Sequence, residues 1–161
     1  MTTSKTRIKK IESPSNPIYK NLLELSTSRG MQEQGQCLVS GEKIIEEQLE
    51  GPSFKDMFWI YTSQEHALFQ RFELPQALIL PPELFKKLDV VGTHAPLLCR
   101  PLPSLTDWSV DSPYSGLQLL CALGDPNNLG ALLRSALAFN VSSVVLLKEC
   151  CHPFHPRVIK S

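Results

Sequence analysis

The sequence lacks an excess of charge of either sign, and it lacks a long apolar run free of polar residues. Lysine and arginine together number 16 among 161 residues, and aspartate and glutamate also number 16, so the formal net charge is zero. No global basic field therefore attracts nucleic acid to the whole chain. The longest apolar stretch, 129–147, contains Arg134 and Asn140, and an arginine alone costs about 2.5–3.5 kcal/mol at the centre of a bilayer. These absences argue against a membrane-spanning segment.

A secretory signal and a disulfide framework are also missing. Residues 1–10 are polar and basic, with no apolar segment after them, unlike a signal peptide. The five cysteines are odd in number, and Cys150 and Cys151 are adjacent, which makes a poor disulfide framework. We therefore expect a reducing, cytoplasmic location. The other cysteines lie in apolar strands, where we expect buried, inert thiols, at Cys37, Cys99 and Cys121.

Short strand patterns alternate with helical patterns over residues 1–100, which we interpret as one domain. Asn16-Pro17 is typical of a helix start, and Gly30 is expected to end that helix. Further helices are predicted over 41–50, 64–71 and 82–88, and strands over 37–39, 57–61, 77–80 and 97–100. This alternation predicts an α/β fold with mainly parallel strand pairing.

A change of composition separates this domain from a second one. Residues 101–116 contain three prolines, four serines and one glycine without a helical period, so we interpret them as a linker. Beyond it, we predict a strand over 117–123, a helix over 128–139 with Asn128 as its N-cap, and a strand over 143–147. A β-α-β unit of about 45 residues is too small to bury its own core. The domain at 117–161 is therefore expected to be incomplete.

The segment from Gly124 to Ala136 carries the most chemistry. A strand end, a tight turn and a helix start follow one another, and open α/β sheets bind ligands at such places. Arg134 is the sole charged residue between Pro126 and Leu147, so it needs an anion, a carboxylate partner or a path to solvent. Structural alternatives remain open: Asn128 as a helix cap only, and Arg134 paired with Asp125 or turned to solvent.

A second cluster, Cys150-Cys151-His152-x-x-His155, has ligand types that zinc prefers. Structural zinc sites usually take their ligands from two separated pairs, whereas all four candidates lie within six residues. Adjacent cysteines rarely share one tetrahedral ion, so we predict no metal site.

The segment Asp125-Pro126-x-Asn128-x-Gly130-x-x-x-Arg134-x-Ala136 resembles the first conserved motif of the SpoU (TrmH-type) RNA ribose 2′-O-methyltransferases, a family of the knotted SPOUT superfamily. Two N-terminal segments, Ser15-Asn16-Pro17-x-x-Lys20 and Gly35-x-Cys37-Leu38-Val39-x-Gly41, resemble its small substrate-binding domain. One departure is Ser40-Gly41, where family members usually carry Glu-Gly. The resemblance covers 7–161 in the same order.

The resemblance implies an RNA substrate-binding domain at 1–100, a linker at 101–116, and the beginning of a Rossmann-like methyltransferase domain at 117–161. It implies methyl transfer from S-adenosylmethionine to a ribose 2′-hydroxyl of rRNA or tRNA. In the family, two later glycine-rich motifs hold the cofactor and most of the dimer interface. Neither is present in 1–161, so we expect the cofactor site beyond Ser161, a homodimer only with that part, and no methylation by this chain alone.

The resemblance also implies roles for single residues. It gives Arg134 an RNA-facing catalytic role supported by Asn128, and makes Asp125, Pro126 and Gly130 structural parts of the motif. Because an arginine pKa exceeds about 12, we expect Arg134 to bind a phosphate or position the hydroxyl. RNA phosphate contacts are expected from the basic residues near the N-terminus, Lys5, Arg7, Lys9, Lys10, Lys20 and Arg29.

Two other functions are alternatives to this enzyme. A non-enzymatic RNA-binding protein that keeps the first domain fits 1–161 equally well, whereas a generic nucleotide-binding protein lacks a glycine-rich phosphate loop. Phe58, Trp59, Tyr61 and Phe69 are expected in a buried core rather than on a base-stacking surface.

Overall fold

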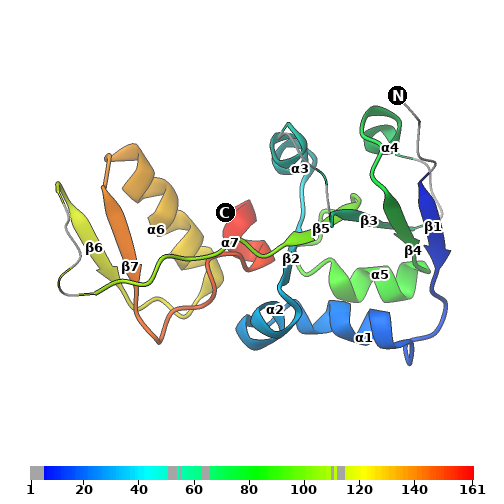
Figure 1. The fold of residues 1–161 in the computed structure, drawn as a ribbon, viewed down its shortest axis with the longest axis horizontal. Helices are drawn as coiled ribbons and strands as arrows, with labels where there is room; N and C mark the ends of the chain where they lie inside the picture. The colour runs from blue at the N-terminus through cyan, green and yellow to red at the C-terminus, as the bar shows by residue number, and fades with distance from the viewer. Residues whose placement is uncertain (1–5, 51–53, 55, 63–65, 110, 112–114) are drawn as a thin grey trace.

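A computed structural model describes residues 6–50, 54, 56–62, 66–109, 111 and 115–161, which form two unequal parts (Figure 1). The larger part is built on a sheet of five strands: β1 (Arg7–Lys10), β2 (Gln36–Val39), β3 (Phe58–Tyr61), β4 (Gln76–Ile79) and β5 (Leu97–Pro101). Their order across the sheet is β1-β4-β3-β5-β2. No helix in the described part of the chain is long and apolar enough to cross a membrane.

The pairing is mixed, which corrects the expectation of mainly parallel strands. β1 and β3 pair with β4 in parallel, but β5 runs antiparallel to both β3 and β2. The chain reverses its direction between β4 and β5. Helix α5 (Pro82–Leu88) and the turn at Asp89 stay at the end of the sheet where β4 finishes, because Leu97 at the start of β5 pairs with Ile60. The chain therefore re-enters the sheet in the opposite direction.

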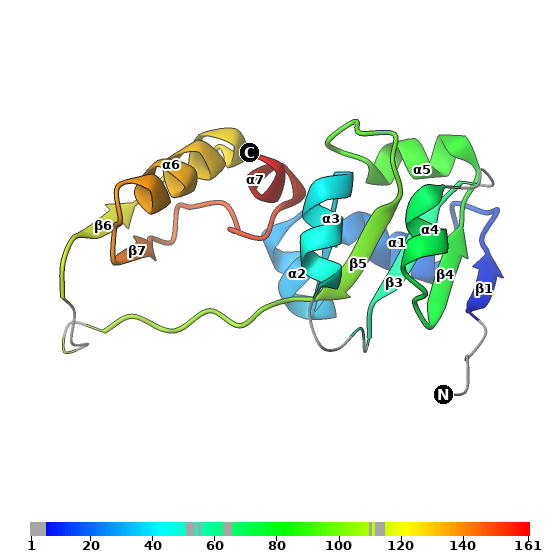
Figure 2. The same cartoon turned by 90° about the horizontal axis from the view of Figure 1, so that it is seen from above.

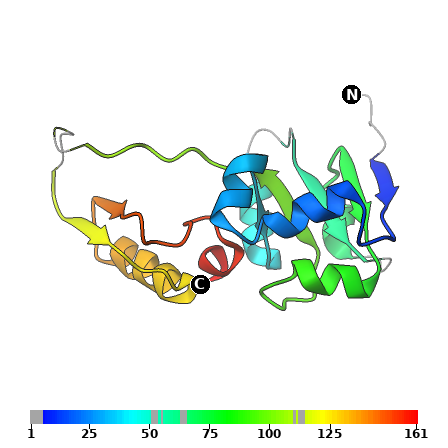
Figure 3. The same ribbon diagram turned by 90° about the horizontal axis from the view of Figure 1, so that it is seen from below.

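Helices cover both faces of this sheet. On one face lie α1 (Pro17–Glu24), α2 (Ser28–Gln34) and α5, seen in Figure 3; on the other lie α3 (Glu42–Leu49) and α4 (Ala67–Arg71), seen in Figure 2. Neighbouring strand residues point to opposite faces, so each strand contributes to both cores. In β5, Leu97 belongs to the core beneath α1, and Leu98 belongs to the core beneath α3; neither is exposed to solvent.

The helix predicted from Pro17 to Gly30 is two helices. α1 ends at Glu24, and α2 begins after Thr27, whose Oγ1 accepts a hydrogen bond from the Gly30 amide at 3.0 Å. Gly30 lies inside α2, where a Cβ atom would overlap the carbonyl group of Glu24. The glycine therefore permits a tight corner between two helices, and Gly35, with φ at 63°, ends the second one.

The smaller part consists of two parallel strands and two helices. β6 (Gln118–Cys121) pairs with β7 (Ser143–Leu146), α6 (Pro126–Ala138) connects them, and α7 (Pro156–Lys160) follows. Its buried core is small: among the described residues, Cys121, Leu129 and Val158 form its buried cluster, and Ala136 of α6 is buried as well. Residues 102–109 have no regular secondary structure and run beside this part as an extended segment (Figure 2).

The two parts meet at α7 and the loop before it. Phe154 packs against the core beneath α1, and Ile159 packs against the core beneath α3. The Arg157 side chain donates through Nε to the carbonyl oxygen of Val90 at 3.2 Å. α7 is thus held by both parts, although it belongs to the smaller one.

A buried hydroxyl joins α1 to α5, and its removal is a test of this packing. Tyr19, 1% exposed, donates through its hydroxyl to the carbonyl oxygen of Leu84 at 3.0 Å. We expect Tyr19→Phe to lower the free energy of unfolding by about 1 kcal/mol, because the carbonyl loses its partner. Urea unfolding at constant m-value measures this. Tyr61→Phe is the control, since the Tyr61 hydroxyl has no hydrogen bond within the described residues; equal losses in both variants would contradict the assignment.

Candidate functional site

The turn after β6 sets the start of helix α6. The Asp125 side chain accepts a hydrogen bond from the backbone amide of Asn128 at 2.8 Å, and Pro126 occupies the first helical turn. The helix therefore begins at Pro126, and Asp125 is its N-cap. This corrects the prediction of a helix start at Asn128 with that residue as the cap. A carboxylate satisfies an unpaired amide there and also faces the positive end of the helix dipole.

Gly130 is the point where α7 approaches α6. It is buried, and a Cβ atom there would lie 2.8 Å from the carbonyl oxygen of Val158, which is closer than side chains tolerate. The backbone of a second helix therefore occupies the space that the missing side chain leaves. Asp125 and Gly130 thus both serve the fold, one at the helix start and one at a helix contact.

Asn128 and Arg134 have a different environment. Both side chains are exposed, and neither has a side-chain hydrogen bond or ion pair within the described residues. Arg134 does not pair with Asp125, which leaves it turned to solvent. Six positions separate Asn128 from Arg134, about 9 Å along the helix and about 120° around it. Asn127, seven positions before Arg134, shares its side of the helix instead.

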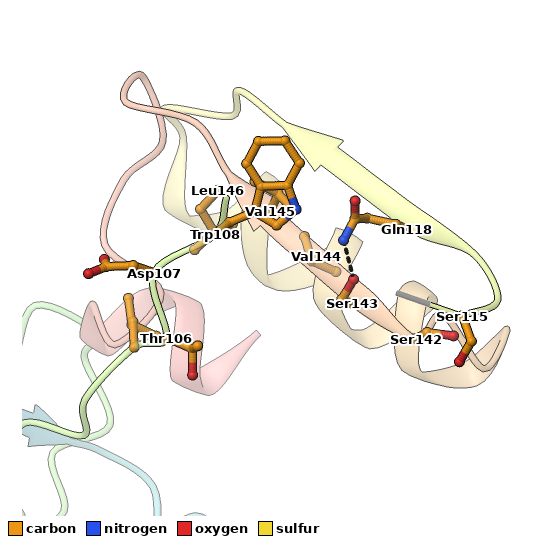
Figure 4. Close-up of a pocket in the computed structure, with 11 residues that line it drawn as sticks. Thr106, Asp107, Trp108, Ser115, Gln118, Ser142, Ser143, Val144, Val145 and Leu146 are labelled. Atoms are coloured by element: carbon orange, nitrogen blue, oxygen red, sulfur yellow. Dashed lines mark hydrogen bonds between the residues drawn. The ribbon is translucent and has the colours of Figure 1, made fainter. Parts of the chain in front are cut away.

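Two cavities border this region without including either residue. One, of about 420 Å³, lies where α7 meets the first part, and Asn127, Arg157 and Lys160 line it. The other, of about 650 Å³, lies between residues 105–108 and β7 (Figure 4). There the Trp108 indole lies over β7 beside Val145, and Gln118 donates to the Ser143 hydroxyl at 2.8 Å.

S-adenosylmethionine, the cofactor that the resemblance implies, does not fit the residues described at this motif. Arg134 and Asn128 lie on the outward surface of α6 and border neither cavity. A methyl donor must be held within reach of the groups that position its acceptor. The described residues at this motif therefore form no cradle for the methyl donor.

The cysteine–histidine cluster before α7 is engaged in local hydrogen bonds. The Cys150 thiol donates to the carbonyl oxygen of Cys121 at 2.9 Å, and the Nδ1 atoms of His152 and His155 accept from the amides of Phe154 and Arg157. Burial lowers the pKa of both histidines, which keeps the rings neutral acceptors. Among the residues with described positions, no three His, Cys, Asp or Glu side chains are grouped to hold a metal ion.

The three strand cysteines are buried, as predicted from the sequence. Burial raises the pKa of the Cys37 thiol to about 11, so it stays protonated and unreactive at neutral pH. Trp59 is buried in the core, also as predicted, but Phe58 is only partly buried. Sequence reasoning missed that difference, because it depends on which helices cover which part of the sheet.

The basic residues of the first part do not form one surface. Lys9 and Lys10 lie on β1 and point to opposite faces of the sheet, and Lys20 is exposed on α1. Arg29, on α2, pairs with Glu33 at 2.7 Å. Lys5 lies outside the described residues. The structure brings Lys9 together with Arg7 alone among these cations, in a cavity beneath α1.

Comparison with known proteins shows a similarity to RNA methyltransferases. No family model matches it. It is 36% identical to the ribosomal RNA small subunit methyltransferase G 2 of Syntrophobacter fumaroxidans, over 95% of this chain and 31% of that protein. A crystal structure of an RNA 2′-O ribose methyltransferase superposes with a TM-score of 0.68 and 27% identity, over 94% of this chain and 60% of that one. The fold is thus that of part of an RNA methyltransferase.

A second structure supports the resemblance to a particular family of these enzymes. An RNA methyltransferase of the TrmH family from Porphyromonas gingivalis superposes with a TM-score of 0.63 and 26% identity, over 88% of this chain and 55% of that one. The resemblance to the SpoU (TrmH-type) RNA 2′-O-methyltransferases is therefore confirmed. The chain spans 31–60% of the length of the curated relatives it matches.

The two kinds of motif residue differ in what their loss does to the fold. We expect Asp125→Ala to lower the free energy of unfolding by about 0.5–2 kcal/mol, because α6 loses its cap. Asn128→Ala is the matched control and should change it by less than about 0.5 kcal/mol, since that side chain is exposed and unpaired. Thermal unfolding of both variants checks this. A loss in Asn128→Ala as large as that in Asp125→Ala would refute the cap assignment.

Proposed function

We propose that this chain is the RNA-binding portion of a SpoU-type methyltransferase that transfers a methyl group from S-adenosylmethionine to a ribose 2′-hydroxyl of rRNA or tRNA. The observation that carries the proposal is the state of Arg134: a cation within the family motif, exposed on α6, with no protein partner among the described residues. Relatives with rRNA methyltransferase names support the RNA substrate. Five free thiols support a cytoplasmic site of action.

Arg134 acts in this proposal by binding and orienting RNA. A guanidinium has five N–H donors and no acceptor, and it keeps its proton at any physiological pH. It is therefore unsuited to remove the proton from a ribose hydroxyl. It is suited to hold a phosphate oxygen by two parallel hydrogen bonds, which fixes the adjacent ribose. Asn128 adds a neutral donor and acceptor on another side of the same helix.

In this proposal, the cofactor site and the dimer interface lie outside residues 1–161. S-adenosylmethionine, when bound, supplies an electrophilic methyl group, and its site is proposed beyond Ser161. We propose a homodimer for the longer protein as well. Leu137 and Phe139, at the end of α6, are 82% and 81% exposed, and apolar side chains of this size are usually covered by further chain or by a partner.

A non-enzymatic RNA-binding protein is the second candidate function. It is favoured by the contrast between the two parts: the first has two large clusters of buried residues, whereas the buried cluster of the second consists of Cys121, Leu129 and Val158. The first part can therefore act as a folded module without methyl transfer. Methylation by a longer protein that contains these residues separates the two functions.

The Arg134 proposal predicts a loss of rate without a loss of cofactor affinity. In a longer protein that contains these residues, Arg134→Ala should reduce methyl transfer to rRNA or tRNA by about 100-fold or more, because the ribose is no longer positioned. Transfer of tritiated methyl groups measures the rate, and calorimetry should give an unchanged Kd for S-adenosylmethionine. Ala131→Ser, an exposed change one turn earlier on the same side of α6, is the control. Full methyl-transfer activity in Arg134→Ala would refute the proposal.

The incomplete cofactor site predicts a negative result for the 161-residue chain itself. Isothermal titration with S-adenosylmethionine should show no saturable heat, because the described residues form no cradle at the motif. A titration with RNA under the same conditions shows that the sample is folded and competent to bind. Micromolar or tighter binding of S-adenosylmethionine would mean that residues 1–161 contain the cofactor site after all.

A further inference from the structure

A third cavity lies on the first part, on the face of the five-stranded sheet that α1 and α2 cover. Its volume is about 360 Å³, within the range of small-ligand sites. It opens where β1, β4 and β3 begin, beside α1 and the end of α2. Its lining contains two cations, four carboxamides and an apolar wall that includes an aromatic ring: Arg7, Lys9, Asn21, Gln34, Gln36, Gln76, Phe58, Ile18 and Leu22.

Strand register explains how these residues come together. Arg7 pairs with Gln76, and Gln76 pairs with Phe58, so the three side chains form one row across β1, β4 and β3. Lys9 lies two positions further along β1 and therefore points to the same face. That face is the one covered by α1 and α2, which leave this row accessible at its margin.

The charges of the cavity favour an anionic ligand. Arg7 and Lys9 are its only charged residues, and no acidic side chain lines it. Neither cation forms an ion pair within the described part of the chain. By contrast, the exposed Arg29 and Arg71 are each paired with a glutamate. The two cations at the cavity thus have their full hydrogen-bonding capacity available.

The neutral groups favour a nucleobase. Asn21, Gln34, Gln36 and Gln76 have no side-chain hydrogen bonds within the described residues, and each carboxamide offers both a donor and an acceptor. Such groups pair with the edges of bases. Phe58, partly buried against the core, offers an aromatic surface of the kind on which unpaired bases stack.

We propose that this cavity binds an unpaired nucleotide of the RNA substrate, with its base beside Phe58 and the carboxamides and its phosphates on Arg7 and Lys9. The proposal rests on the proposed function, since it names the single-stranded part of the RNA as what the first domain recognises. A base within a duplex cannot enter such a cavity, because both its faces are stacked and its edge is paired. Lys9 lines this cavity and Lys10 does not, whereas the sequence alone gives the two lysines the same expected role.

The test uses the full 161-residue chain and a fluorescein-labelled single-stranded oligoribonucleotide of about ten nucleotides, with binding followed by fluorescence anisotropy. Lys9→Ala should weaken binding about fivefold and reduce the salt dependence by about 0.7 in slope. Lys10→Ala is the matched comparison: it removes the same charge from the same strand on the opposite face, and should weaken binding clearly less than Lys9→Ala does. Equal losses in the two variants overturn the proposal.

A second pair of variants tests the base rather than the phosphate. Phe58→Leu should weaken binding about fivefold or more, because it removes a stacking surface. Since Phe58 also packs on the core, Gln76→Glu serves as an isosteric, exposed change that places a negative charge in the cavity. It should weaken binding, whereas Gln32→Glu, exposed on α2 outside the cavity, should not. Unchanged affinity in both Phe58→Leu and Gln76→Glu overturns the proposal.

Two competitors identify the ligand class. The duplex form of the same RNA and a polyglutamate of equal charge should each compete at least tenfold more weakly than the unlabelled single strand; equal competition by either overturns the assignment to unpaired RNA. Arg134→Ala separates this proposal from the proposed function. Methyl transfer that survives Arg134→Ala in the longer protein refutes the function, whereas the Lys9 and Lys10 comparison refutes or supports the cavity independently.

Discussion

The scarcity of buried apolar surface in the second part is the constraint on which the rest of the structure depends. A single β-α-β unit buries only one side of its two strands, and here the buried apolar residues are few among those described: Cys121, Leu129, Ala136 and Val158. α7 supplies one of them, Val158, and it can do so only because Gly130 carries no side chain. The same helix places Ile159, and the loop before it Phe154, against the first part. The second part is therefore held in place by its neighbour as much as by its own core.

This constraint explains why the two parts have such different surfaces. In the first part, β5 contributes Leu97 and Cys99 to one core and Leu98 to the other, so the sheet is filled on both faces. In the second part, large apolar side chains such as Leu120, Leu137 and Phe139 remain exposed. The first part is thus filled on both faces of its sheet, whereas the second exposes apolar side chains of a size that further chain or a partner usually covers.

Local patterns in the sequence predicted most elements of the fold, and the failures have local causes. The helix predicted at 82–88 is present and begins at a proline, and the strand predicted at 57–61 is present over 58–61, where the apolar residues are continuous. β1 was missed because Arg-Ile-Lys-Lys has one apolar residue, and a charged edge strand needs no more. The row of Arg7, Gln76 and Phe58 could not be predicted at all, because it arises from pairing between distant strands.

The motif on α6 shows why spacing alone could not separate residues that the fold uses from residues that it leaves unpaired. Asp125 accepts a hydrogen bond from a backbone amide, and the backbone of a neighbouring helix packs against Gly130, so the fold uses both positions. Arg134 and Asn128 have no side-chain hydrogen bonds within the described residues, and an exposed polar side chain without a partner has almost no effect on stability. A residue that the fold does not use is one that a ligand can use. Unused hydrogen-bonding capacity, visible only in three dimensions, is therefore what distinguishes the two kinds of position, on α6 and in the cavity beneath α1 alike.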